Sequence, residues 1–197
     1  MLRRWQDLAE AIDFFKKNAV RYRIDTSNII LAGNSAGAII ALQAAYSSNA
    51  ELSALTNKND STLPSPRRPT AVAAVINFWG ALLDTAWLQN ANVPIISVHG
   101  RKDRIVPYKQ NGNSLYGSYI IHLKADSLNI PNRLKTYESF GHELQKHFIP
   151  ILRSRATKRR WMEAANFSAD FLYNEVFLRA SSSHTSVKND SHLLKIP

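Results

Sequence analysis

The sequence predicts an α/β fold, in which a mostly parallel sheet of about four strands carries helices on both faces. Two observations support this prediction. Short runs that are apolar at every position alternate along the chain with longer segments of helical periodicity. The runs are apolar throughout rather than at every second residue, which is typical of parallel strands buried on both faces.

The N-terminal half of the chain predicts two helices with a strand between them. Apolar residues at intervals of three and four positions lie on one face of a helix over residues 2–23. Residues 28–32 form a short apolar run that ends at a glycine, as a buried strand does. Residues 36–46 are alanine-rich and apolar nearly all round, so we expect a helix in the middle of the domain. Residues 49–70 are polar, carry three prolines near their end and predict a surface loop.

The C-terminal half predicts the remaining strands and helices. Further strands are expected at residues 71–78, 93–98 and 133–137, the last of them more exposed. Helical segments are expected at about residues 82–88, 115–128 and 161–179. Residues 1–180 would then form one domain, followed by a polar tail at residues 181–197 that is rich in serine, histidine and asparagine.

Composition narrows the class of protein. With 197 residues, 45% of them hydrophobic, the chain has enough apolar surface for one packed domain, which excludes a disordered protein. It has 25 Lys and Arg against 15 Asp and Glu, a net charge of +10, so nucleic acid is a candidate partner. The basic residues are dispersed, however, and only residues 153–160 form a dense cluster. This pattern favours a solvated surface over a nucleic-acid site.

Cysteine and membrane signals are both absent from the sequence. Without cysteine there is no disulfide, thiolate metal site or cysteine nucleophile. The first residues lack the uninterrupted apolar core of a signal peptide, and no run reaches the ~20 apolar residues of a membrane span. We therefore expect a soluble chain, whose compartment and oligomeric state remain open.

One short motif points to chemistry: Gly33, Asn34, Ser35, Ala36 and Gly37 fit the pattern G-x-S-x-G. It lies directly after a predicted buried strand and directly before a predicted buried helix, the setting of a nucleophile elbow. Such a sharp turn lifts the serine hydroxyl above the sheet, and the glycines keep side chains out of places where backbones approach. The helix N-terminus provides unpaired N–H groups, so Ser35 is the expected nucleophile and the Ala36 amide the expected first oxyanion donor. The alternative is an ordinary glycine-bounded turn.

A serine hydroxyl needs a base, and the base needs a carboxylate that orients it. Asp103 follows the third apolar run, where the C-terminal end of a parallel strand delivers side chains to one edge of the sheet. His142 follows the fourth predicted strand and Gly141, so it should reach the same edge. We therefore expect Asp103 to be the acid and His142 the base. A loop aspartate paired with neighbouring basic residues, and a histidine that only follows a turn, are the alternatives.

Other polar residues are weaker candidates for these roles. Asp84 follows the second predicted strand but suits a helix N-cap better. Glu138 lies too near His142 along the chain to orient it easily, and His99 would place the base before the acid. His122 is expected on a helix as a surface or packing residue. No H-E-x-x-H, Walker A or dinucleotide motif occurs, so neither a metal nor a cofactor is expected.

In these features the chain resembles the α/β-hydrolase family, in particular its bacterial carboxylesterase, lipase and acetyl-esterase-like branch. The similar stretches are AIDFFKKNAVRYRIDTSNIILAGNSAGAIIALQAAY, VPIISVHGRKDRIVPY and GSYIIHLKADSLNIPNRLKTYESFGHEL. They occur in the family order of serine, acid and histidine, each at its expected strand exit. The resemblance implies that Ser35, Asp103 and His142 hydrolyse an ester through an acyl-enzyme.

The chain departs from this family in one respect. In the family the serine elbow follows the fifth strand of an eight-stranded sheet, whereas here it follows the first predicted strand. The strands that precede it in the family, and the loop that supplies a second oxyanion N–H, have no counterpart in the sequence. We therefore expect this chain to be the C-terminal part of a longer hydrolase.

Substrate specificity is encoded only weakly. The segment after the second predicted strand, with Trp79, Gly80 and Leu82, would line an apolar pocket together with Asn34, although simple packing beneath the site is the alternative. We expect a small-molecule ester as substrate. The alternative functions are a serine peptidase of the prolyl-oligopeptidase-like group, which shares the fold and the triad order, and a catalytically inactive fragment or binding module.

Overall fold

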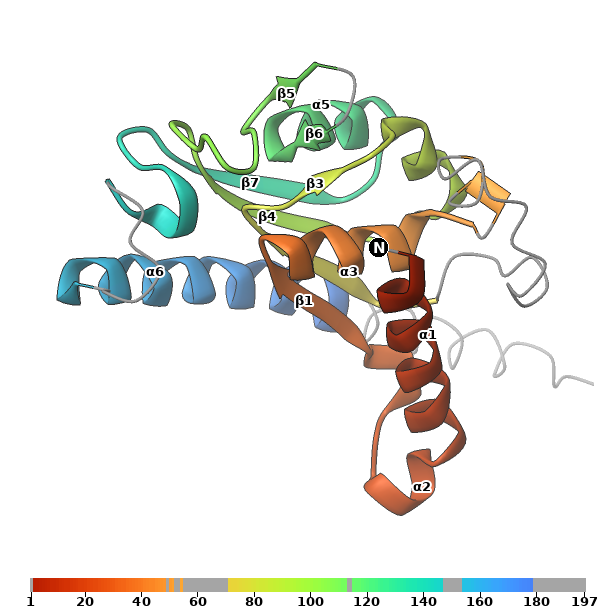
Figure 1. Cartoon of the computed structure of the whole chain (residues 1–197). Coiled ribbons are helices and arrows are strands. Elements are labelled where there is room, and N and C mark those ends of the chain that lie inside the picture. Colours follow the sequence, from red (N-terminus) through yellow and green to blue (C-terminus); the bar gives the residue numbers. More distant parts are fainter. Residues whose placement is uncertain are drawn as a thin grey trace, which may run out of the picture.

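Figure 1 shows the computed structural model of the chain, which describes residues 2–48, 50–51, 54, 71–112, 115–146 and 154–178. Most of the loop expected at residues 49–70 lies outside these ranges. The tail expected at residues 181–197 and the domain boundary expected before it lie wholly outside them.

A four-stranded parallel sheet forms the centre of the fold, as predicted. Its strands are β1 (Ile30–Asn34), β2 (Ala74–Phe78), β4 (Ile95–Gly100) and β7 (Asn132–Tyr137), and they lie side by side in this order. Each new strand adds to the same side of the sheet, so β1 forms one edge and β7 the other among the described residues. All four C-terminal ends therefore lie along one rim of the sheet.

Helices cover both faces of this sheet (Figure 1). On one face lie α3 (Ala36–Tyr46) and α5 (Ser118–Ser127), and α1 (Leu2–Lys17) packs against α3. The opposite face carries α6 (Arg155–Leu172), which continues into a π-helical turn at Tyr173–Phe177. The long N-terminal helix predicted over residues 2–23 is divided in two, because the chain turns at Asn18 before the short α2 (Ala19–Tyr22). None of the described helices is long and apolar enough to cross a bilayer.

The last helix begins earlier than its apolar periodicity predicts. Its N-cap is Ser154, whose hydroxyl accepts the N–H of Thr157 at 3.1 Å. The first turn that follows is rich in Arg and Lys, so it carries no apolar stripe that a periodicity analysis could detect. The capping serine was the only available signal.

A small antiparallel sheet was not predicted. It pairs β3 (Ala81–Leu82) with β6 (Leu115–Gly117), and β6 with β5 (Gln110–Asn111). The helices expected at residues 82–88 and 115–128 therefore begin later, as the 3₁₀ segment Thr85–Asn90 and as α5. Strands of two or three residues are too short to show the period-2 pattern on which their prediction depends.

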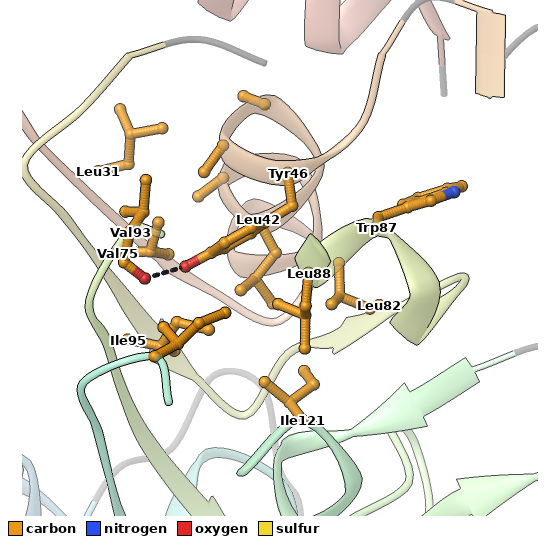
Figure 2. Packing of buried hydrophobic residues seen from close by; sticks show 14 of the residues in the cluster. Leu31, Leu42, Tyr46, Val75, Leu82, Trp87, Leu88, Val93, Ile95 and Ile121 are labelled. Atoms are coloured by element: carbon orange, nitrogen blue, oxygen red, sulfur yellow. Dashed lines mark hydrogen bonds between the residues drawn. The ribbon is translucent and has the colours of Figure 1, made fainter. Parts of the chain in front are cut away.

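The described residues form two main hydrophobic layers, one on each face of the sheet, and a small third cluster of Ile39, Ala81 and Val106. The larger layer joins α1, α3 and α5 to the sheet, and Figure 2 shows its centre around Leu42, Tyr46, Val75 and Ile95. The Tyr46 hydroxyl lies in this layer and donates a hydrogen bond to the carbonyl of Val93. Burial raises the pKa of Tyr46 well above its ordinary value, which keeps the hydroxyl protonated.

The smaller layer lies beneath α6. Its buried members are Trp79, Val98, Leu144 and Ala164, and the half-buried Trp161 packs against them. The rings of Trp79 and Trp161 are tilted against each other with centroids 5.7 Å apart. Trp161 thus anchors α6 to the sheet.

Candidate active site

The rim of the sheet brings together the three residues that the sequence singled out. Ser35 follows β1, Asp103 follows β4 and His142 follows β7. The Ser35 hydroxyl oxygen lies 3.0 Å from His142 Nε2, and His142 Nδ1 lies 2.7 Å from Asp103 Oδ2. One imidazole therefore contacts a hydroxyl with one nitrogen and a buried carboxylate with the other.

Ser35 occupies a strained turn between β1 and α3. Its φ of 51° and ψ of −122° lie in a region that residues with a side chain rarely adopt. The turn is held at both ends, because Ser35 N–H donates to the Phe78 carbonyl at 2.9 Å and Ile39 N–H donates to the Ser35 carbonyl at 3.1 Å. Strain of this kind persists only where surrounding contacts compensate for it.

The two glycines of the motif have different roles. A Cβ on Gly33 would lie within 2.5 Å of the backbone nitrogen of Ala38, so β1 and α3 can approach each other only with glycine there. A Cβ on Gly37 would meet only Asn34 Oδ1, at 4.0 Å, among the described residues. The expectation that both glycines prevent a clash therefore holds for Gly33 and is wrong for Gly37.

The Ala36 amide directly follows Ser35 at the N-terminus of α3. Ala36 is the first residue of α3 and is exposed. Backbone N–H groups in the first turn of a helix have no partner within the helix, and the helix dipole favours negative charge beside them. This amide can therefore stabilise an oxyanion that forms at Ser35.

Asp103 is buried and accepts hydrogen bonds with both carboxylate oxygens. Oδ1 accepts the backbone N–H groups of Ile105 and Val106, at 2.8 and 3.0 Å. Oδ2 lies 2.7 Å from His142 Nδ1 and 3.3 Å from His99 Nε2. Burial alone would raise the pKa of Asp103, but the hydrogen bonds from His142, from His99 and from the backbone outweigh it and lower the pKa to about 2. The carboxylate is therefore ionised at neutral pH.

The loop that carries His142 has an irregular backbone. His142–Leu144 form a 3₁₀ turn in which Glu143 and Leu144 have φ values of 52° and 58°. Gly141 N–H closes the loop by donating to the Gln145 carbonyl at 2.7 Å. A Cβ on Gly100 would lie 2.5 Å from the Phe140 carbonyl oxygen, so the end of β4 lies directly beneath the loop.

Two side chains of α6 fasten this loop from the other side. Arg160 Nε donates to the Leu144 carbonyl and Trp161 Nε1 to the Glu143 carbonyl, both at 2.9 Å. The Arg160 guanidinium also lies 3.9 Å from the centre of the Phe140 ring. The position of the base therefore depends on α6 as well as on β7.

The remaining candidates have other partners. Asp84 Oδ1 accepts the Ala86 N–H at 2.8 Å, which is the N-cap role expected for it. Glu138 forms a surface pair with Arg101 at 3.2 Å, and His122 contacts Asp126 at 3.6 Å on α5. The described residues contain no group of three or more side chains suited to bind a metal ion.

His99 is the one residue beside the acid that the sequence interpretation set aside. It lies at the end of β4 and is fully buried. The signal available in the sequence was its position: a histidine four residues before Asp103, at the exit of an apolar strand.

An apolar cavity of about 460 Å³ opens between the ends of β1 and β2 and helix α6. Of the four residues expected at a substrate pocket, Asn34 and Trp79 line this cavity. Gly80 and Leu82 do not. Leu82 is fully buried in the larger core layer because β3 turns back beneath the rim, and Gly80 packs against the Ala38 side chain. The other lining residues are Ala32, Gly33, Phe78, Trp161, Met162, Ala164 and Ala165.

The chain matches one family model and is similar in fold to several solved structures. Residues 3–89 match the BD-FAE family model. The fold is similar to an esterase of the Planctomycetes species Thermogutta terrifontis, with a TM-score of 0.56 and 16% identity over 86% of this chain and 63% of that chain. The same esterase phosphorylated by paraoxon gives a TM-score of 0.59 and 18% identity, over 85% of this chain and 62% of that one.

A second protein is similar to the same extent. MGS-M1, an alpha/beta hydrolase enzyme from a Medee basin deep-sea metagenome library, gives a TM-score of 0.54 and 17% identity over 86% of this chain and 63% of that chain. This chain thus spans about 63% of the length of these solved structures. No curated protein matches the sequence.

Proposed function

This chain has the α/β-hydrolase fold, and we propose that it is a serine hydrolase that cleaves carboxylic esters through Ser35, His142 and Asp103. The observation that carries the proposal is the unbroken hydrogen-bonded line from the Ser35 hydroxyl through both nitrogens of His142 to Asp103. The similar Thermogutta terrifontis structures support it, since that protein is an esterase and one of its structures is phosphorylated by paraoxon.

In the proposed mechanism, the hydrogen bonds of the triad set the path of proton transfer from Ser35 to His142. Asp103 accepts the Nδ1–H of His142, so Nε2 carries the lone pair that accepts the Ser35 proton. As the Ser35 oxygen bonds to the ester carbonyl carbon, His142 takes that proton and Asp103 stabilises the imidazolium. The carbonyl oxygen becomes an oxyanion beside the Ala36 N–H.

Acylation is completed first, and deacylation by water follows. The tetrahedral intermediate collapses to an acyl-enzyme, and His142 gives its proton to the leaving alcohol. Water then attacks the acyl carbon while His142 takes a proton from it, and collapse of the second intermediate returns that proton to Ser35. The products are a carboxylic acid and an alcohol.

The apolar cavity favours a substrate with an uncharged hydrocarbon part. The cavity is lined by Asn34, which adjoins Ser35 in the chain, although Ser35 itself is not among its lining residues. Because most of the lining is apolar, we expect aliphatic or aromatic groups of a small-molecule ester to bind there. A peptide substrate gains no support from the similar structures.

Labelling by a fluorophosphonate probe tests the proposal, because the probe bonds to a serine only when a base activates it. We expect the chain to be labelled and Ser35→Ala to abolish labelling. The matched control is Ser127→Ala, since Ser127 lies exposed on α5 and its hydroxyl, among the described residues, donates to the Lys124 carbonyl. This control should be labelled like the wild type.

Hydrolysis of p-nitrophenyl acetate against an aminoacyl anilide then separates esterase from peptidase. Faster turnover of the anilide would favour the peptidase alternative. A folded chain that is not labelled would instead favour an inactive binding module.

A further inference from the structure

His99 is a buried histidine for which the mechanism above has no use. Its Nε2 lies 3.2 Å from the Val106 carbonyl oxygen and 3.3 Å from Asp103 Oδ2. Its Nδ1 lies 2.7 Å from the hydroxyl of Ser118, at the start of α5. The side chain is fully inaccessible to solvent, and these three polar contacts, together with the Tyr108 ring at 5.7 Å, hold its orientation.

The contacts continue behind His99 into the sheet. Asn77, on β2, donates from Nδ2 to the Ser118 hydroxyl and to the Ser97 hydroxyl, each at 3.0 Å. Its Oδ1 accepts the backbone N–H of Gly80 at 2.9 Å. All of these polar side chains are buried, which makes a mismatch in donor or acceptor costly.

Elementary donor and acceptor chemistry requires a proton on His99 Nε2, and with a neutral imidazole it gives this network one consistent set of proton positions. A backbone N–H can only donate, so the Asn77 atom that faces Gly80 is the oxygen and Nδ2 faces Ser118. A carboxylate and a carbonyl can only accept, so His99 Nε2 carries a proton. Ser118 then accepts from Asn77 and donates its own proton to His99 Nδ1. Every N–H and O–H along this line points toward Asp103.

We propose that His99 is a positioning residue of this hydrolase: Ser118 and Asn77 hold it as the Nε2–H tautomer, and its single Nε2–H is shared between the Val106 carbonyl at 3.2 Å and Asp103 Oδ2 at 3.3 Å. The inference rests on the proposed function. Two backbone N–H groups fix Oδ1, and His99 with His142 fixes Oδ2, so the carboxylate plane cannot rotate when His142 becomes an imidazolium. An acid that is held in this way keeps His142 aligned with Ser35 through both halves of the reaction.

The tautomer is tested without any activity. Nitrogen-15 NMR of the histidine rings in the full chain distinguishes a ring protonated at Nε2 from one protonated at Nδ1, and His99→Gln identifies the signal. We expect His99 to be the Nε2–H tautomer. A ring protonated at Nδ1, alone or together with Nε2, would overturn the inference, whether or not the chain is a hydrolase.

The rate of fluorophosphonate labelling at Ser35 tests the positioning role. His99→Phe keeps a planar ring and removes both nitrogens, so we expect the labelling rate constant to fall about 10- to 100-fold. His99→Gln keeps an N–H donor and should recover part of that loss. The matched control is His122→Phe, because His122 contacts Asp126 on α5 and Asn132 at the start of β7, the end of that strand opposite to His142, and should leave the rate unchanged.

A merely structural role is separated by two further readouts. Unfolding of a fraction of the molecules lowers the final labelled fraction, whereas loss of positioning lowers the rate at a constant labelled fraction. In an Asp103→Asn background, His99→Phe should add no further loss, because its effect passes through that carboxylate. Wild-type rates in His99→Phe, or equal losses in both backgrounds, would refute the inference, whereas an unlabelled wild type refutes the proposed function instead.

Discussion

The two glycines around Ser35 give a matched pair of substitutions with opposite expected outcomes. Gly33→Ala places a methyl group within 2.5 Å of both the Ala38 nitrogen and the Gly37 carbonyl oxygen. These are backbone atoms, so no rotamer change relieves the clash. Gly37→Ala places its methyl group in space where only Asn34 Oδ1 lies nearby, at 4.0 Å.

The expected magnitudes follow from these contacts. An ordinary carbon contact needs about 3.5 Å, so α3 must move away from β1 by roughly 1 Å to accept Gly33→Ala. Overpacking of this kind costs about 1–3 kcal/mol, and we expect the upper end because the obstacle is backbone. Gly37→Ala replaces a helical glycine and should raise the free energy of unfolding by about 0.5–1 kcal/mol.

Urea denaturation followed by circular dichroism measures both values, and probe labelling reports on Ser35. We expect Gly33→Ala to lose stability and, because α3 begins directly after Ser35, to be labelled more slowly. A Gly33→Ala variant as stable as the wild type would show that β1 and α3 do not approach as described. So would a Gly37→Ala variant that is destabilised to the same extent as Gly33→Ala.

Three further predictions concern two side chains at the site and one in the core. The pKa of Asp103 is about 2 in the folded state, below the ordinary 3.8. Ionised Asp103 therefore adds about 2 kcal/mol to the free energy of unfolding above about pH 4, and this contribution is lost as the pH falls toward 2. The difference in urea stability between wild type and Asp103→Asn should shrink over that range; a constant difference would contradict the shift. Trp161→Phe removes the hydrogen bond to the Glu143 carbonyl and should cost about 1 kcal/mol and slow labelling, whereas unchanged labelling would separate α6 from the base. Tyr46→Phe leaves the Val93 carbonyl without its donor and should cost about 1–2 kcal/mol in urea denaturation with labelling unaffected; slower labelling would reveal a link to the site.

The sequence was most informative where chemistry and topology coincide. Ser35, Asp103 and His142 each follow an apolar strand, and parallel strands deliver such residues to one rim. Their meeting follows from the strand pattern alone. The turn at Ser35 was predictable for the same reason, because Gly33 marks the place where strand and helix come closest.

The polar network behind the acid was hidden by the same pattern. Asn77 and Ser97 are single polar residues within apolar runs, and a run counted as apolar conceals them. Ser97 and His99 are two positions apart on β4 and so face the same side, which was the available clue. Leu82 was expected in the pocket wall but is buried in the core. An apolar side chain directly after a strand suits either place, so the sequence could not distinguish them.

The three triad residues are far apart along the chain, so formation of the site reports on how far folding has progressed. Ser35 and His142 are 107 positions apart, and His142 and Asp103 are 39 apart. No local segment can assemble an activated serine, because β1 and β7 must first join opposite ends of one sheet. Contacts this distant in sequence form slowly. Short pulses of the serine probe during refolding would therefore label only the molecules in which all four described strands have already paired. The labelled fraction as a function of time gives the rate constant for pairing of that sheet.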